Sequence, residues 1–521
     1  MTAFILAHVT GLIVLVLTVL ALLALLRFIY RPPSLAGRSK TKALAPDPDC
    51  ALLAKLGDTK HHAANLSGIH ILDHGAEAFA ARRGMLRLAE HSIDAQYYMW
   101  HADLTGNLLM GELLAAADRG VRVRLLLDDN TTIGTDQMLL AAAAHANVEV
   151  RLFNPFILRK PRTPAYVFDL RRLNRRMHNK SLIVDGVASI VGGRNIGDEY
   201  FNAHLDLDFA DMDVLTVGAV VPAIAASFDA YWNSKSAYPL ERIVKTPTDG
   251  FLDRFKTSLT DLGESDAAIA YRKHISVTPL VSSGGQVDFD WVPVELVADD
   301  PAKGQGDIPR RKLLFTSLSK RLGAVESSVD VVTAYFVPGR QGSTYLGKTA
   351  EQGKKVRVLT NSLASNDVIP VHAGYARYRK RLLRHGVALH ELRNIRDIRP
   401  VRRSGKAKLP RFGASSSSLH AKVFVLDKRR VFIGSLNFDP RSIYLNCEMG
   451  LLIDSEKLGH KLTRQMDHLI SSQAYLPFLE SGNRLSWRDI DNTVYRVEPG
   501  STKRQRVVAW VMSWLPVEWL L

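Results

Sequence analysis

The sequence has very little cysteine. Two cysteines, Cys50 and Cys447, stand far apart in a chain of 521 residues. A disulfide framework or a zinc site built from thiolates needs more cysteines at closer spacing, so both are excluded. The chain also lacks a long low-complexity tract, and 46% of its residues are apolar. It is therefore expected to fold around ordinary apolar cores, and its length suits two domains of about 200 to 250 residues with appendages.

Acidic residues are under-represented. The chain has 68 Lys and Arg but 52 Asp and Glu, which gives a formal net charge of +16. Such an excess favours anionic partners, and both nucleic acid and the acidic surface of a lipid bilayer fit this description. The charge by itself leaves both classes open.

Charged residues are absent from Ala3 to Leu26, where only His8, Thr10 and Thr18 interrupt an apolar run. This run has the length of about 20 residues that a membrane-spanning helix needs. A cleaved signal peptide is the alternative, but no Lys or Arg precedes the run. The sequence therefore predicts a transmembrane anchor over residues 1–31. The cations that follow it place the remaining chain in the cytoplasm by the positive-inside rule; they are Arg27, Arg31, Arg38, Lys40 and Lys42.

The chain after this anchor contains a long repeat. Residues 32–48 hold four prolines and read as a linker. Strand, helix and strand patterns follow over residues 92–127, and again over residues 328–360. This alternation predicts an α/β protein with two α/β/α sandwich domains, each with a mixed or parallel sheet, related by a pseudo-twofold axis. The expected domains are residues 49–285 and 286–500.

The last 21 residues form a separate segment. Residues 501–521 contain Trp510, Trp514 and Trp519 on an apolar stretch preceded by basic residues. Tryptophan flanked by cations is typical of an element that lies in the interface of a bilayer. The alternative is a C-terminal helix packed on the body of the protein.

One motif occurs once in each repeat. His178 and Lys180 are followed by Asp185, and His420 and Lys422 by Asp427, in the pattern H-x-K-x4-D. Both motifs lie on strand-like runs, so His and Lys at i and i+2 point to the same side and can address one phosphate. The two aspartates fall where the strands end, which favours a structural and electrostatic supporting role.

Polar donors follow each motif at the same distance. Asn195 lies 17 residues after His178, and Asn437 lies 17 residues after His420. Together with Ser435 they can donate hydrogen bonds to a phosphodiester as charge spreads over its oxygens. The first repeat has Gly193 where the second has Ser435. It lacks that hydroxyl, and the two half-sites are expected to differ.

These segments resemble the phospholipase D superfamily, and in particular bacterial cardiolipin synthases of the C type. The similarity extends from about residue 70 to the end and is clearest in R-M-H-N-K-S-L-I-V-D-G, G-G-R-N-I-G-D-E-Y-F, L-H-A-K-V-F-V-L-D and G-S-L-N-F-D-P-R-S-I-Y-L-N-C-E. The resemblance implies that Glu448 in the second half and, by a looser match, Asp211 in the first are the carboxylates that orient the motif histidines. It also implies phosphatidyl transfer to phosphatidylglycerol at the inner membrane of a bacterium, with phosphatidylglycerol or phosphatidylethanolamine as the donor.

The residue types suggest a mechanism that needs no cofactor. One histidine, His178 by analogy with the superfamily, attacks phosphorus, while His420 first protonates the leaving alcohol and then deprotonates the incoming one. Carboxylates at metal-binding spacing do not accompany the motifs, so no metal is implied.

The same sequence features are compatible with other functions to different degrees. A phospholipase D hydrolase and a nuclease share the histidine chemistry, but the membrane span makes nucleic acid an unlikely partner. An inactive scaffold would be expected to have lost a motif residue. Gly342 to Thr349 also fits the phosphate-binding pattern G-x-x-x-x-G-K-[ST], although it aligns with an ordinary helix start in the first repeat. The need for a protein partner stays open.

Overall fold

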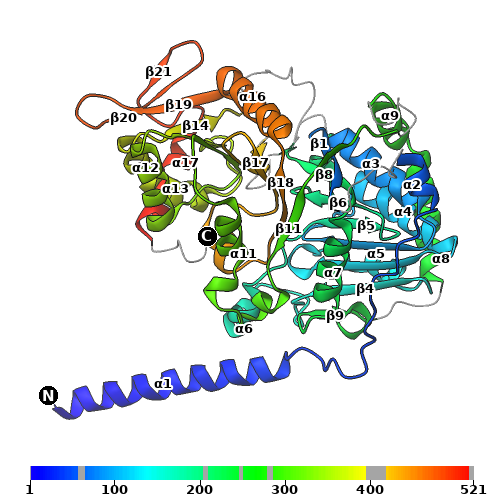
Figure 1. Cartoon of the computed structure of the whole chain (residues 1–521). Helices are drawn as coiled ribbons and strands as arrows, with labels where there is room; N and C mark the ends of the chain where they lie inside the picture. The colour runs from blue at the N-terminus through cyan, green and yellow to red at the C-terminus, as the bar shows by residue number, and fades with distance from the viewer. Residues whose placement is uncertain are drawn as a thin grey trace.

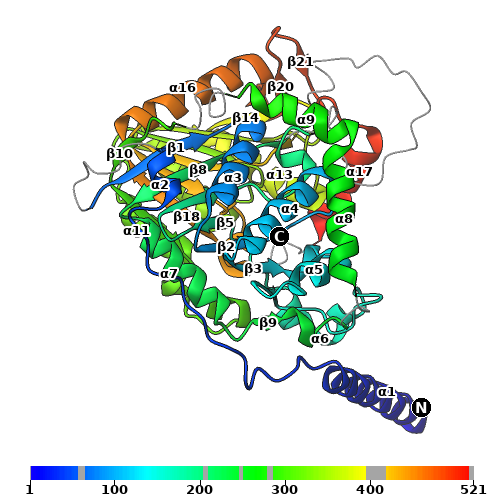
Figure 2. The same ribbon diagram turned by 90° about the vertical axis from the view of Figure 1, so that its right-hand side faces the viewer.

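The computed structural model describes residues 2–56, 65–203, 209–245, 250–278, 286–394 and 418–515. Trp519, and Gly284 and Gly285 at the expected domain boundary, lie outside these residues. The first element, α1 (Thr2–Ile29), projects away from the folded body (Figures 1 and 2). Its residues Phe4–Ile29 have a mean hydropathy of 3.0, and α1 alone among the described helices has the length and composition to cross a membrane.

Residues 30–50 lead from α1 to the body without a helix or strand. They are nevertheless held in place. The Arg38 guanidinium donates to the backbone oxygens of Asn233, Ser234 and Ala237 at 2.6 to 2.7 Å. The predicted linker therefore runs along the surface of the first half.

The first half is built on a nine-stranded mixed sheet. Three adjacent strands run parallel, as expected for strand, helix, strand units, and the other pairs are antiparallel. The strands, in spatial order, are β10 (Asp290–Val292), β1 (Ser67–Leu72), β8 (Asp213–Gly218), β6 (Ala188–Gly192), β5 (Ser181–Val184), β2 (Ser92–Tyr97), β3 (Arg122–Asp128), β4 (Val148–Phe153) and β9 (Ala237–Pro239).

The second half repeats this sheet. Its ten strands are β11 (Val294–Ala298), β18 (Met449–Asp454), β17 (Arg430–Gly434), β16 (Lys422–Leu426), β12 (Ser328–Thr333), β13 (Lys355–Asn361), β14 (Ala388–Leu392), β19 (Ala474–Leu479), β20 (Leu485–Arg488) and β21 (Val494–Tyr495). From β11 to β19 the order matches β1 to β9 strand for strand. The predicted duplication is thus present in the fold, and the chain passes from the first sheet to the second at Pro293, between β10 and β11.

Helices cover the outer faces of both sheets. On the first half these are α3 (Gly75–Leu88), α4 (Leu104–Asp118), α5 (Asp136–Ala143), α8 (Phe251–Glu264) and α9 (Asp266–Ser276). On the second they are α11 (Leu314–Leu322), α12 (Gly339–Glu351) and α13 (Ile369–Arg384), with α17 (Lys503–Trp514) packed on α13. Short helices α2 (Ala51–Leu56), α6 (Ala165–Leu173) and α15 (Pro440–Tyr444) lie in connections.

The inner faces of the two sheets meet in one apolar core. Ile183 and Val214 from the first sheet belong to the same buried cluster as Val423 and Ile433 from the second. Two helices, α7 (Val221–Trp232) and α16 (Glu456–Gln473), flank this shared core against the first and second sheets. The two halves lie side by side in Figure 1, and their packing fixes how the two motifs face each other.

Candidate active site

Each motif begins just before a strand and is anchored by the opposite half. The His178 N–H donates to the Cys447 carbonyl at 2.8 Å. The His420 and Ala421 N–H groups both donate to the Ala210 carbonyl at 2.9 Å. The motif strands β5 and β16 therefore start at the seam between the halves, and the histidines lie there.

The carboxylates that orient the histidines are exchanged between the halves. The Nδ1 atom of His178 lies 2.9 Å from Oε2 of Glu448, and Nδ1 of His420 lies 2.5 Å from Oδ2 of Asp211. Both carboxylates are fully buried. A carboxylate at Nδ1 fixes the tautomer with its proton on that nitrogen, which leaves the lone pair of Nε2 available. The sequence predicted the four residues but did not show that each histidine is served by the other repeat.

The two lysines make the same hydrogen bond, each to the backbone of its own motif. Lys180 Nζ donates to the His178 carbonyl at 2.6 Å, and Lys422 Nζ donates to the His420 carbonyl. Both side chains are buried. Burial lowers the pKa of Lys180 to about 7 and also lowers that of Lys422, although Glu448 and Asp211 act in the opposite direction. Such ammonium groups are positioned to bind an anion at this seam.

Burial also governs the charge of the histidines. It lowers the pKa of both His178 and His420 to about 4, more than their carboxylate partners can offset. Burial would raise the pKa of Glu448, but His178 and Lys180 outweigh it and lower that pKa. His420 and Lys422 likewise hold the pKa of Asp211 well below its usual range. At neutral pH the empty site thus holds neutral imidazoles beside ionised carboxylates.

The amides predicted to bind phosphate are both buried near the motifs. Asn195 donates from Nδ2 to the Tyr200 hydroxyl at 2.9 Å, and its Oδ1 has no hydrogen-bond partner among the described residues. Asn437 is also buried, and its Oδ1 accepts from the Thr333 hydroxyl at 3.5 Å. This geometry is compatible with the amide roles that we predicted.

Ser435 has a different environment from the one we expected. Its hydroxyl donates to the Glu448 carboxylate and accepts from the Met449 N–H at 3.0 Å. The Ser435 hydroxyl is therefore committed to the carboxylate that orients His178. We assign Ser435 a positioning role in place of direct phosphate binding.

Gly193, the counterpart of Ser435, explains the asymmetry between the half-sites. A Cβ atom at Gly193 would lie 2.1 Å from Oδ1 of Asp211. The absence of a side chain at position 193 makes room for the shorter carboxylate, while the second half pairs a serine with the longer Glu448. The missing hydroxyl is thus part of how Asp211 reaches His420.

The motif aspartates lie at the far ends of their strands. Asp185 accepts from the N–H groups of Glu90, His91 and Ser92 at 2.8 to 3.0 Å, which ties the end of β5 to the start of β2. Asp427 does the same for residues 326–328, at the start of β12. Both have positive φ values, 52° and 54°, as tight turns require. These contacts support the structural role and place neither carboxylate at the seam.

Two tyrosines that we did not predict line the site. The Tyr98 ring packs edge-on against His178 with centroids 4.9 Å apart, and the Tyr200 ring packs against His420 at 5.3 Å. Tyr200 lies in the segment G-D-E-Y-F, but no pattern in the sequence indicates that it faces His420 of the opposite half. Both rings restrict the histidines and limit the access of water to them.

One group of side chains could offer ligands to a metal. Ligand atoms of His101, Asp103 and Glu199 lie within 4.8 Å of one another. Asp103 already caps α4 through the Gly106 N–H and accepts from the Asp198 N–H, and His101 lies 3.3 Å from Glu199. These contacts with one another and with the backbone explain why the three side chains lie close together.

Comparisons with known proteins agree with this geometry. A family model described as "Cardiolipin synthase, PLD-like domain" matches residues 83–232 and 318–470. Cardiolipin synthase C of Escherichia coli is 44% identical over 462 residues, which cover 87% of this chain and 96% of that protein. A cardiolipin synthase of Geobacillus kaustophilus is 27% identical over 78% of this chain and 66% of its own length. The solved structure of phosphatidylserine synthase from Haemophilus influenzae matches 88% of this chain and 98% of its own with a TM-score of 0.56 at 15% identity, which shows a shared fold.

Proposed function

Because the chain belongs to the cardiolipin synthase family with phospholipase D-like domains, we propose that it transfers a phosphatidyl group to phosphatidylglycerol to form cardiolipin. The observation that carries this proposal is the pair of buried histidines at the seam, each hydrogen-bonded to a carboxylate of the opposite half. Two such imidazoles are what a two-step exchange at phosphorus requires: one nucleophile and one acid and base.

In the first step, Nε2 of His178 attacks phosphorus and a phosphorus–nitrogen bond forms. The bond from phosphorus to the head-group oxygen breaks, and that oxygen takes a proton from Nε2 of His420, which the imidazole takes up when the anionic lipid binds. In the second step the acceptor hydroxyl gives its proton to His420 and attacks phosphorus, which releases His178. The phosphohistidine retains the free energy of the diester, so the exchange requires no nucleotide.

The difference between the carboxylates supports this division of roles. Asp211 makes the shorter contact to its histidine, 2.5 Å against 2.9 Å for Glu448. Glu448 also shares its charge with the Ser435 hydroxyl. Asp211 is therefore the better stabiliser of an imidazolium, and His420 the better carrier of a proton. Lys180, Lys422, Asn195 and Asn437 would neutralise and orient the phosphate oxygens, while Asp185 and Asp427 hold the motif strands in place.

The membrane supplies both substrates in this proposal. We place α1 across the inner membrane of a bacterium, with the two halves of the body, which join at Pro293, on the cytoplasmic side. The donor is phosphatidylglycerol or phosphatidylethanolamine. The cations after α1 support that orientation.

Trapping of the intermediate tests the proposal. The full chain is incubated with lipid that carries a labelled phosphate and is quenched in alkali, where phosphohistidine survives. We expect acid-labile label on His178 in the wild type, slower labelling of His178 in His420→Ala because the leaving group lacks its acid, and no label in His178→Ala. Label on His420 alone would reverse the two roles. Full turnover by either alanine variant would contradict a shared site.

A further inference from the structure

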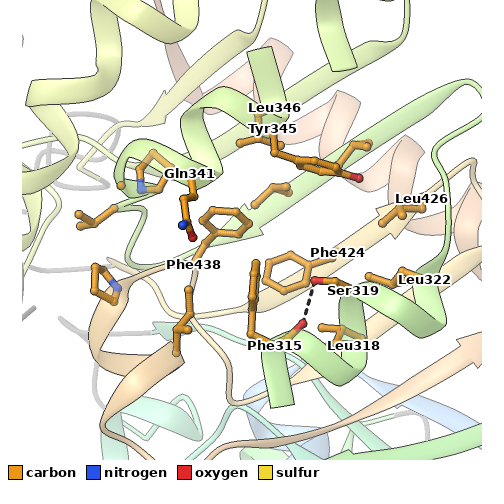
Figure 3. Close-up of a pocket in the computed structure, with 18 of the residues that line it drawn as sticks. Phe315, Leu318, Ser319, Leu322, Gln341, Tyr345, Leu346, Phe424, Leu426 and Phe438 are labelled. Carbon is orange, nitrogen blue, oxygen red and sulfur yellow. Dashed lines mark hydrogen bonds between the residues drawn. The ribbon is translucent and has the colours of Figure 1, made fainter. Parts of the chain in front are cut away.

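The outer face of the second sheet is incompletely filled. A cavity of about 590 Å³ opens between α11 and α12. Figure 3 shows that apolar side chains from both helices and from the sheet surround it, with Phe438 near the centre of the view. The residues that carry the argument are Phe315, Leu318, Leu322, Leu346, Phe424 and Leu426. A volume of this size is in the range of ligand pockets.

The cavity exists because α12 lacks the apolar residues of its counterpart in the first half. Helix α4 buries Leu109, Met110, Leu113 and Leu114 against α3 and the sheet. When Gly106 and Gly111 are aligned with Gly342 and Gly347, the corresponding residues of α12 are Tyr345, Leu346, Thr349 and Ala350. Smaller or outward-facing side chains replace three of the four. The space that α4 fills in the first half is therefore left open in the second.

The same helix accounts for the phosphate-loop pattern. Residues 342–349 lie entirely within α12, Gly339–Glu351, so their backbone N–H groups serve the helix from Gly342 onward. A phosphate-binding loop needs such groups to be free before the helix begins. The glycines and small residues of the pattern instead shape the wall of an apolar cavity.

The cavity is continuous with the strand faces that carry the site. On β16, Lys422, Phe424 and Leu426 alternate on one face, and the last two form the floor of the cavity. On β12, Val329 and Val331 line it, and the next residue on that face, Thr333, is paired with Lys422 and bonded to Asn437. Phe438, adjacent to Asn437, also lines the cavity. The floor thus starts two residues from a phosphate-binding lysine.

We propose that this cavity holds one acyl chain of the phospholipid substrate while its phosphate lies at the paired histidines. The inference rests on the proposed function. The apolar lining suits a hydrocarbon chain and disfavours a polar occupant. Arg340, which is exposed at the rim, can remain near the anionic head group. The opening between α3 and α4 of the first half is smaller, about 430 Å³, and charged side chains such as Arg83, Arg87 and Glu112 line it. It suits an acyl chain less well, so the two lipids of the exchange are held differently.

A rim substitution tests the cavity. Ser319 is exposed on α11, lines the cavity, and bonds only to the Phe315 carbonyl of its own helix. Ser319→Trp puts a large ring into the cavity without disturbing the core. Ser258→Trp on α8 is the matched control, because Ser258 is also exposed and bonds to the Phe255 carbonyl of its helix. The full chains are assayed in phosphatidylcholine vesicles that contain either dioleoyl or dioctanoyl phosphatidylglycerol.

In Ser319→Trp we expect the ratio of kcat/KM for the dioleoyl lipid to that for the dioctanoyl lipid to fall by about tenfold or more, the effect of leaving about two methylene groups unburied. The ratio should not change in Ser258→Trp. An unchanged ratio in Ser319→Trp, with cardiolipin still formed, would overturn the cavity assignment and leave the proposed function intact.

Photocross-linking supplies a second measurement that does not depend on turnover. Phosphatidylglycerol with a diazirine near the end of one acyl chain is irradiated with the wild-type chain in the same vesicles. We expect adducts on residues 314–322 or 339–351, and fewer in Ser319→Trp. Adducts there without cardiolipin synthesis would support the cavity and refute the proposed function. Adducts confined to α1 would overturn the cavity assignment.

Discussion

At the scale of residues, the contact between Asp211 and Gly193 is the clearest difference between the half-sites. Gly193→Ser would place a Cβ atom 2.1 Å from the Asp211 carboxylate and displace it from His420. Asp211→Glu adds a methylene group where no room has been made. We expect each single variant to lower kcat by about 10²-fold to 10⁴-fold, as when the carboxylate of a catalytic histidine is lost.

The double variant Gly193→Ser with Asp211→Glu rebuilds the arrangement of Ser435 and Glu448. We expect it to recover activity relative to both single variants, measured as cardiolipin formed per folded molecule. A double variant no better than the weaker single one would contradict the positioning role of this pair. Circular dichroism spectra of all three variants control for folding.

The protonation of the empty site gives a second prediction at this scale. The pKa of His178 and of His420 is about 4 and that of Lys180 about 7, so at pH 7 the imidazoles are neutral and the lysine is partly charged. A bound phosphodiester anion favours the protonated forms and raises these pKa values. Binding at pH 7 should therefore take up protons.

Calorimetry in buffers of different ionisation enthalpy measures this uptake. The ligand is a phosphonate analogue of phosphatidylglycerol that cannot be cleaved. We expect net proton uptake at pH 7 that becomes smaller in His420→Gln. A binding enthalpy that does not depend on the buffer would rule out the coupling.

At the scale of elements, the motif aspartates fix strand ends. Asp185→Ala would leave the N–H groups of residues 90–92 without their acceptor. We expect a loss of about 2 to 4 kcal/mol in the free energy of unfolding, because a charged acceptor of three buried or partly buried donors is removed. Thermal unfolding of the detergent-solubilised chain measures the change as a lower Tm.

The activity of the same variant separates this role from a chemical one. Below its Tm, Asp185→Ala should form cardiolipin at a rate within a few fold of the wild type, since the carboxylate lies away from the seam. Loss of turnover in a variant that is still folded would assign Asp185 to the chemistry.

The elements themselves were largely predictable from the sequence. The strands expected to start near residues 92 and 328 are β2 and β12, and the helices that follow them end at Asp118 and Glu351, two residues before Gly120 and Gly353. Alternating apolar residues and glycines determine such limits locally. The pairing of Asp211 and Glu448 with the histidine of the opposite half was not predictable, because it depends on how the inner faces of the two sheets pack together. Helix α12 has smaller side chains than α4 at the matching positions. In the sequence this difference appeared only as a phosphate-loop pattern, which suggested a different function.

At the scale of the whole molecule, membrane attachment has two candidate elements. Helix α1 is exposed along its length. Helix α17 packs on α13, where Arg377 donates to the carbonyls of Ser513 and Leu515, yet it leaves Trp510 63% and Trp514 73% exposed. Helix α17 is therefore packed on the body, and it also presents two tryptophan side chains to its surroundings; that it lies in a bilayer interface stays a prediction.

Deletion of residues 1–31 should release much of the protein from membranes, because a spanning helix binds far more strongly than an interfacial one. Chemistry toward detergent-dispersed lipid should survive. Flotation with vesicles measures attachment, and Trp510→Ser with Trp514→Ser in the truncated chain should reduce what remains. A truncated chain that stays fully bound would make α17 the main anchor.

The choice of acceptor also belongs to the whole molecule, and it decides between a transferase and a hydrolase. Water is far more concentrated than any lipid alcohol, so transfer requires that the alcohol be held in place and the solvent excluded. The seam buries both histidines beneath Tyr98 and Tyr200, and the anchor keeps it at a surface dense in lipid head groups. These features favour the hydroxyl of phosphatidylglycerol over water in the second step.

We therefore expect the purified full chain to form cardiolipin faster than phosphatidic acid in vesicles of phosphatidylglycerol, with or without phosphatidylethanolamine. Thin-layer separation of products from labelled lipid gives both rates in one assay. Tyr200→Ala opens the His420 side of the seam and should shift the products toward phosphatidic acid, because water then reaches the phosphohistidine. If the wild type yields phosphatidic acid alone in every lipid mixture, even when cell extract is added to supply a protein partner, the chain acts as a hydrolase, and burial of the histidines serves a purpose other than the choice of acceptor.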